Sequence, residues 1–124
     1  MHPTEIAENE EKILEEIKEI EQLAKKPKVV AIGEIGLDYY WVKEEEKRNL
    51  QKISFLEQIK LANKLNLPII IHSRDAIMDT IEILKGDIKP EKHGILHCCQ
   101  LNKDLVKAGL EVRHVYIFCR LDNI

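Results

Sequence analysis

The sequence predicts an α/β fold with a parallel sheet of the barrel type. Short apolar runs alternate along the chain with segments whose apolar residues recur at helical spacing. This alternation calls for parallel strands joined by right-handed crossovers. Three of the runs stop at a residue that can bind a metal ion, namely Glu34, His72 and His97. Because parallel barrels carry their chemistry at the C-terminal ends of their strands, these side chains form the candidate site.

The first part of the chain is predicted to be a helix, a strand and a second helix. Residues 5–25 carry an apolar stripe, with Thr4 as a suitable N-cap and Pro27 as the stop. Residues 28–33 are almost all apolar, as expected for a strand that is covered on both faces. Residues 44–65 repeat the helical stripe.

The second part continues the alternation and shows no linker, repeat or low-complexity segment. We therefore expect residues 1–124 to form a single domain. The elements predicted here are a strand over 68–72, a helix over 75–85, a strand over 94–98, a helix over about 102–109 and a last strand over 115–118.

Length and composition limit what the chain can be. Its 124 residues can build one core, whereas a complete eight-stranded α/β barrel needs roughly 250. A formal net charge of −3 gives no bulk attraction to nucleic acid, although a bound divalent ion would add positive charge at a site. No apolar run suits a signal peptide or a membrane span, so we expect a cytoplasmic protein without a membrane partner. The three cysteines, an odd number, predict reduced thiols rather than a disulfide or zinc framework.

Glu34, His72 and His97 together predict a divalent metal centre. Glu34 stands between two glycines after its strand, where a carboxylate can bridge two ions, position a water molecule or simply cap the next loop. A lone histidine such as His72 is more often a hydrogen-bonded core residue. His97 repeats the placement one strand later, and the agreement among three strand ends favours the metal centre.

Polar residues beside these three suit supporting roles. Arg74 fits a phosphate group, because its planar guanidinium binds two oxygens at once. Asp38 can hold a ligand histidine or Arg74 in place, and Asp75 belongs to a polar cluster that would be costly to bury without a function. Residues 39–41, with the sequence YYW, can stack on a substrate base, pack or act as a lid. A divalent ion here would lower the pKa of bound water and stabilise charge on a phosphoryl oxygen.

Three motifs resemble the TatD family of metal-dependent deoxyribonucleases. They are GEIGLDYYW at 33–41, PIIIHSRDA at 68–76 and GILHC at 94–98, in this order and at suitable spacing. The resemblance extends over about residues 2–109, and residues 110–124 diverge from it. It implies a partial TIM-type (β/α) barrel of the metallo-dependent hydrolase kind, about half of the full barrel.

The resemblance also implies an activity and a site. Proteins of this family hydrolyse phosphodiester bonds in DNA, commonly from the 3′ end, with Mg, Mn or Zn and up to two ions in the full site. Glu34, His72 and His97 fall on the family's metal-ligand positions, with Glu34 as the catalytic carboxylate. Arg74 would bind the DNA substrate, and Asp38 and Asp75 would support the ligands.

Two motifs of the family are absent from the chain. The Asp-x-His-x-His motif of the first strand and the late Thr-Asp-x-Pro motif, whose aspartate binds metal, do not occur. Met1-His2-Pro3 resembles the end of the family's second strand. We therefore expect the middle of such an enzyme, with a divergent or frameshifted tail. The alternatives are a catalytically inactive fragment and an interaction module that self-associates through the open edges of a half-barrel sheet.

Overall fold

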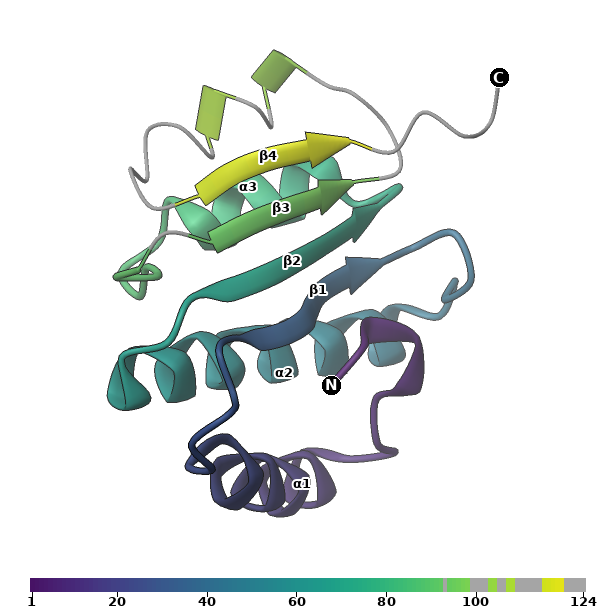
Figure 1. Ribbon diagram of the computed structural model, residues 1–124. Helices are drawn as coiled ribbons and strands as arrows, with labels where there is room; N and C mark the ends of the chain where they lie inside the picture. Colours follow the sequence, from purple (N-terminus) through teal and green to yellow (C-terminus); the bar gives the residue numbers. More distant parts are fainter. Residues whose placement is uncertain (93, 99–102, 105–106, 109–114, 120–124) are drawn as a thin grey trace.

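The computed structural model describes residues 1–92, 94–98, 103–104, 107–108 and 115–119. In this part of the chain, four parallel strands form one sheet in the order β1-β2-β3-β4 (Figure 1). The elements are η1 (Pro3–Glu5), α1 (Glu10–Ala24), β1 (Ile32–Asp38), α2 (Glu45–Leu65), β2 (Ile69–Arg74), α3 (Ile77–Leu84), β3 (Gly94–Cys98) and β4 (Val115–Cys119). The predicted α/β alternation with parallel strands is confirmed.

Helices α2 and α3 pack on one face of the sheet, and α1 packs on α2 below the β1 edge of the sheet (Figure 1). The core lies between the sheet and these helices. Leu37, Ile71 and Leu96 from three neighbouring strands are fully buried there, together with Phe55 and Ile59 of α2. Burial of such side chains is the main favourable contribution to folding.

The opposite face of the sheet carries no helix in the described part of the chain. Ile95 on β3 is 43% exposed, and Val30, just before β1, is 77% exposed. Side chains alternate between the two faces of a strand, so Ile95 and His97 share this open face while Leu96 points to the helices. The expectation that residues 28–33 form a strand covered on both faces is not met, because Val30 and Gly33 are exposed. In a closed barrel this face would line the interior.

Helix α1 begins at Glu10, later than the predicted start. The Asn9 side chain caps it by accepting a hydrogen bond of 2.9 Å from the backbone N–H of Lys12. The residues before Asn9 include the separate turn η1, so Thr4 is not the N-cap of this helix.

Strand β1 is also displaced towards the C-terminus relative to the predicted span of 28–33. Its pairing with β2 starts where the N–H of Ile32 donates to the carbonyl oxygen of Pro68 at 3.0 Å, and continues to Asp38 opposite Arg74. The residues before Ile32 have no stretch of β2 beside them to pair with. The apolar run therefore predicted a strand in this region, whereas the position of β2 determines which residues pair.

The remaining elements agree with the prediction within a few residues. Residues 103–104 and 107–108 are helical, and the rest of the predicted helix over 102–109 lies outside the described residues. The cysteine side chains also lie outside them. None of the described helices is long and apolar enough to cross a membrane.

Candidate metal centre

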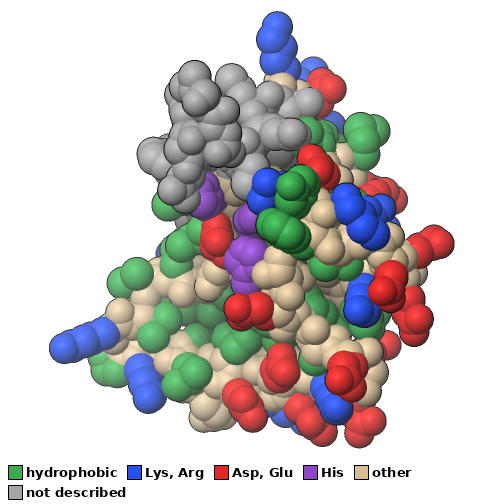
Figure 2. All heavy atoms as spheres, turned by 90° about the vertical axis from the view of Figure 1, so that its right-hand side faces the viewer, with side chains coloured by type: hydrophobic (Ala, Val, Ile, Leu, Met, Phe, Trp, Pro, Cys, Tyr) green, Lys and Arg blue, Asp and Glu red, His purple; other side chains and the backbone are tan. Residues whose placement is uncertain are grey.

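The predicted ligands meet at the C-terminal end of the sheet. In the register of the sheet, His72 on β2 lies opposite Gly36 on β1 and opposite His97 on β3. Residues paired in this way point to the same face, so the two imidazoles lie on the open face of the sheet. Figure 2 faces this end of the molecule and shows histidine side chains gathered near its centre, beside carboxylates.

Glu34 reaches the same place because β1 is irregular there. The register passes from Gly33 opposite Ile70 to Ile35 opposite Ile71, which leaves Glu34 as the extra residue of a bulge. A bulge breaks the strict alternation of side chains and re-aims one of them, and bulges are frequent beside active sites. The carboxylate of Glu34 can therefore turn towards the histidines.

Gly36 allows β1 and β2 to approach each other at this point. Its φ is +137°, in the region that favours glycine. A Cβ atom at this position would collide with the backbone carbonyl oxygen of His72. The second glycine of the Gly-Glu-Ile-Gly segment is thus required by the backbone that carries Glu34 and His72.

Glu34 lies between two histidines. Its Oε2 is 2.6 Å from Nδ1 of His97, and its Oε1 is 3.5 Å from Nε2 of His2. The rings of His2 and His72 are in contact, with centroids 4.7 Å apart. One ligand atom from each of His2, Glu34 and His72 lies within 4.8 Å of the others. The four side chains therefore belong to one cluster.

His2 is the member of this cluster that sequence reasoning did not select. It stands directly before η1, and the signal that could have found it is the resemblance of Met1-His2-Pro3 to the end of the family's second strand. Burial, and next the neighbouring His72, lower the pKa of His2. A lowered pKa favours the neutral imidazole, which is the form that binds a metal ion.

The side chains of the cluster fit a divalent ion. Imidazole nitrogens combined with a carboxylate are a donor set that zinc and related divalent metals accept. Glu34, His72 and His2 converge closely enough to share one ion, and His97 adjoins them through the second oxygen of Glu34. These are the residues that would hold the metal.

Asp38 is buried behind His72 and fixes the orientation of its ring. Its Oδ2 is 2.9 Å from Nε2 of His72. Gln51 of α2 binds the backbone of Asp38 on both sides: its Oε1 accepts from the N–H at 2.9 Å, and its Nε2 donates to the carbonyl oxygen at 3.1 Å. A carboxylate that orients a ligand histidine is the usual second partner in metal sites. The proposed supporting role of Asp38 thus has a geometric basis.

Arg74 and Asp75 differ in their surroundings. The guanidinium of Arg74 lies over the ring of Tyr40, 3.9 Å from its centroid. Asp75 is exposed in the turn between β2 and α3, with φ at 52°. Among the described residues, no hydrogen bond joins Asp75 to the histidines or to Glu34, so its supporting role stays a prediction.

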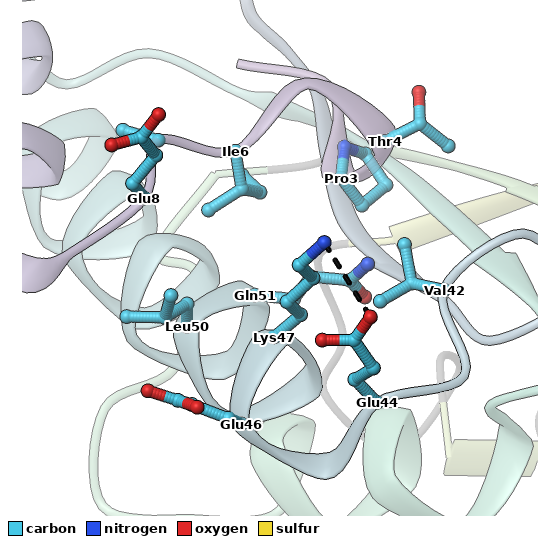
Figure 3. Close-up of a pocket in the computed structure, with 11 residues that line it drawn as sticks. Pro3, Thr4, Ile6, Glu8, Val42, Glu44, Glu46, Lys47, Leu50 and Gln51 are labelled. Carbon is cyan, nitrogen blue, oxygen red and sulfur yellow. Dashed lines mark ion pairs between the residues drawn. The ribbon is translucent and has the colours of Figure 1, made fainter.

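One cavity is separate from the histidine cluster. It has a volume of about 380 Å³ and lies between η1 and the first turns of α2 (Figure 3). Its lining combines an apolar floor, to which Ile6 and Leu50 belong, with a rim on which Glu44 and Lys47 form an ion pair at 3.7 Å. Gln51 links the two regions, since it lines this cavity and also holds the backbone of Asp38.

Comparisons with known proteins identify the family of the chain. A model of the family described as TatD related DNase matches residues 1–118. YabD of Bacillus subtilis, an uncharacterized metal-dependent hydrolase, is 46% identical over 117 residues, which cover 94% of this chain and 44% of YabD. A protein of Escherichia fergusonii named 3′-5′ ssDNA/RNA exonuclease TatD is 34% identical over 99 residues, which cover 77% of this chain and 36% of that protein.

A solved structure extends the agreement to three dimensions. YJJV, a TatD homologue from Escherichia coli K12, matches with a TM-score of 0.76 and 26% identity, over 94% of this chain and 43% of that structure. The chain spans less than half the length of each of these relatives, and its sheet is about half of a TIM-type barrel. The chain belongs to the TatD related DNase family.

Proposed function

We propose that this chain provides about half of a metal-dependent hydrolase centre that cleaves phosphodiester bonds in DNA from the 3′ end. The observation that carries the proposal is the convergence of His2, Glu34 and His72, with His97 bound to the same carboxylate. Membership of the TatD related DNase family supports a nucleic-acid substrate. The name of the Escherichia fergusonii relative, an ssDNA/RNA exonuclease, supports an exonuclease.

In this proposal the chain's own residues hold and orient the reacting groups. Glu34, His72, His97 and His2 would hold the ion, and Asp38 keeps the His72 ring in place. A divalent ion, Mg, Mn or Zn and up to two in a full site, would activate water and stabilise charge on the phosphoryl oxygens. Glu34 is the proposed catalytic carboxylate, because its two oxygens face different histidines and can serve the ion and a water molecule separately.

Arg74 is the proposed ligand of the substrate phosphate. It ends β2, two residues after His72, and its planar guanidinium can bind two phosphate oxygens at once. With a net charge of −3, the chain depends on such local positive groups and on the ion to attract DNA. A cytoplasmic location is proposed with this function.

Metal binding and DNA hydrolysis can be tested separately. Equilibrium dialysis with Mn²⁺ or Zn²⁺ measures the first, and release of nucleotides from 5′-labelled single-stranded DNA, with and without chelator, measures the second. We expect Glu34→Gln to reduce both, while Glu11→Gln, on the exposed side of α1, leaves both unchanged. Equal metal binding by the chain and by Glu34→Gln would show that Glu34 is not a ligand. Metal binding without hydrolysis would favour the inactive-fragment alternative.

A second candidate function is self-association through the open sheet. Its support is the uncovered face with Ile95, together with strands β1 and β4 at the two edges of the described sheet. Exposed sheet edges present unpaired N–H and C=O groups to other chains. Sedimentation velocity over a range of concentrations tests this function. A monomer at all concentrations would rule it out.

A further inference from the structure

The loop between β1 and α2 holds two exposed aromatic side chains next to the metal centre. Tyr40 is 43% exposed and Trp41 is 67% exposed. Both rings are large and mostly apolar, so burying their exposed surface against a bound molecule would be favourable. The metal centre does not use either ring.

The two rings and a neighbouring guanidinium form a small platform. Tyr40 and Trp41 meet edge to face, with centroids 4.8 Å apart and planes at 86°. The guanidinium of Arg74 lies 3.9 Å from the centroid of Tyr40 and 5.9 Å from that of Trp41. The ammonium of Lys43 lies 5.5 Å from the Tyr40 ring. The platform thus combines flat π faces with two positive charges.

Hydrogen bonds fix the backbone of this platform at both ends. The Oδ1 of Asp38 accepts from the N–H of Tyr40 at 3.0 Å and from the N–H of Trp41 at 3.1 Å. Arg48 of α2 donates to the carbonyl oxygen of Val42 at 2.9 Å, just beyond the two aromatics. A loop held in this way loses little freedom on binding, which favours a binding role over a purely mobile lid.

Asp38 connects the platform to the metal centre. Its Oδ2 binds His72 while its Oδ1 holds the two loop N–H groups, so one carboxylate orients a proposed ligand and the platform together. Arg74 lies opposite Asp38 in the sheet register. A strand whose phosphate reached Arg74 would therefore bring an adjacent base towards the rings.

We propose that Tyr40 and Trp41, beside the phosphate ligand Arg74, form a base-stacking subsite that binds an unpaired nucleobase of the strand being hydrolysed. Aromatic faces and guanidinium planes stack on any base, because every base has a π face. Bases inside a duplex have their faces covered, so the subsite selects single strands and free ends, in DNA or RNA. The subsite deepens the proposed hydrolase function and rests on it for the identity of the strand.

Trp41 is the only tryptophan of the chain, which gives a direct readout of stacking without hydrolysis. Its fluorescence is followed in chelator while a short oligothymidylate is added, and the titration is repeated with an abasic oligonucleotide of equal length and charge. We expect quenching by the oligothymidylate and little by the abasic strand. No quenching by either strand, or equal quenching by both, would overturn the subsite. Both titrations use the unchanged chain, so they do not depend on the folding of a variant.

Substitutions then assign the effect to the platform. By fluorescence anisotropy of a labelled oligothymidylate, Trp41→Ala is expected to weaken binding by about 5- to 150-fold, the range for one stacked base. Trp41→Phe keeps an aromatic face and should retain most of the affinity. Leu23→Ala, an equally exposed apolar position on α1 (56% exposed), is the control and should bind as the parent chain does. Equal affinity of the parent and Trp41→Ala would overturn the proposal.

These experiments separate the subsite from the hydrolase function. A chain that stacks oligothymidylate but never hydrolyses it would keep the subsite and refute the activity. A chain that hydrolyses DNA with metal, yet binds abasic and normal strands equally well, would keep the activity and refute the subsite.

Discussion

Replacing Gln51 by methionine tests how the metal centre is supported from the helix layer. Gln51 is 1% exposed and makes two hydrogen bonds with the backbone of Asp38, at 2.9 and 3.1 Å. Methionine has a similar length and nearly the same helix propensity, so Gln51→Met removes these bonds with little change in volume. The buried backbone N–H and carbonyl groups of Asp38 then lose the hydrogen bonds that Gln51 makes with them.

The expected cost follows from these two groups. A buried donor or acceptor without a partner costs about 1–3 kcal/mol, so the loss of partners for these two groups should lower the free energy of unfolding by roughly 2–6 kcal/mol. That is a large share of the roughly 5–15 kcal/mol that stabilises a typical domain. Because Asp38 orients His72, metal affinity should fall together with stability.

Urea unfolding followed by circular dichroism measures the stability change, and equilibrium dialysis measures the metal affinity. The control is Gln22→Met at an exposed position of α1, where the same substitution removes no buried contact. If Gln51→Met loses no more than Gln22→Met, within about 0.5 kcal/mol as for ordinary surface changes, the reasoning about the buried Asp38 backbone is wrong.

Three further predictions concern the backbone, the pH and the metal. Gly36→Ala should prevent stable folding, because its Cβ would collide with the carbonyl of His72; loss of the cooperative thermal transition would show this. The hydrogen bond from the Tyr39 hydroxyl, and next the contact with Lys52, hold the pKa of Asp79 below its ordinary 3.8. The advantage of the parent chain over Asp79→Asn should thus be full above about pH 5 and vanish as the pH falls through the lowered pKa, in unfolding measured at a series of pH values. Zn²⁺ or Mn²⁺ at about 100 times its dissociation constant should stabilise the parent chain by about 2.7 kcal/mol and leave Glu34→Gln unchanged, as seen in thermal shifts.

Hydrophobic periodicity was sufficient to find most of the elements but not the exact span of β1. The helix predicted over 44–65 is α2, Glu45–Leu65, and the strand predicted over 94–98 is β3. The predicted strand over 28–33 follows the apolar run, whereas the paired strand β1 is Ile32–Asp38, because β2 lies beside those residues. Buried positions can be recognised because their residues are apolar, whereas strand pairing depends on a partner strand elsewhere in the chain. Local sequence therefore could not place this strand.

Some residues of the site could likewise be predicted from the local sequence, and others depend on contacts between distant parts of the chain. Glu34, His72 and His97 follow apolar runs, and the parallel order of the strands brings such positions to one end of the sheet. His2 follows no such run and joins the cluster only through the folded arrangement of η1 beside β1. The resemblance of Met1-His2-Pro3 to a strand end of the family pointed to His2, and the structure adds its contacts with Glu34 and His72. The sequence of the loop with Tyr40 and Trp41 fits base stacking, packing or a lid, and the hydrogen bonds of Asp38 and Arg48 favour a fixed platform.

Asp38 explains why the Gly-Glu-Ile-Gly-Leu-Asp segment works as one unit. The bulge at Glu34 turns one carboxylate to the histidines, and four residues later the second carboxylate lies behind His72. Gln51 secures the backbone of Asp38, while Asp38 itself secures the loop that carries the aromatic rings. A change at any of these points should therefore alter metal affinity and base stacking together. By contrast, a change at Trp41 itself should alter stacking alone, because its side chain supports no ligand among the described contacts.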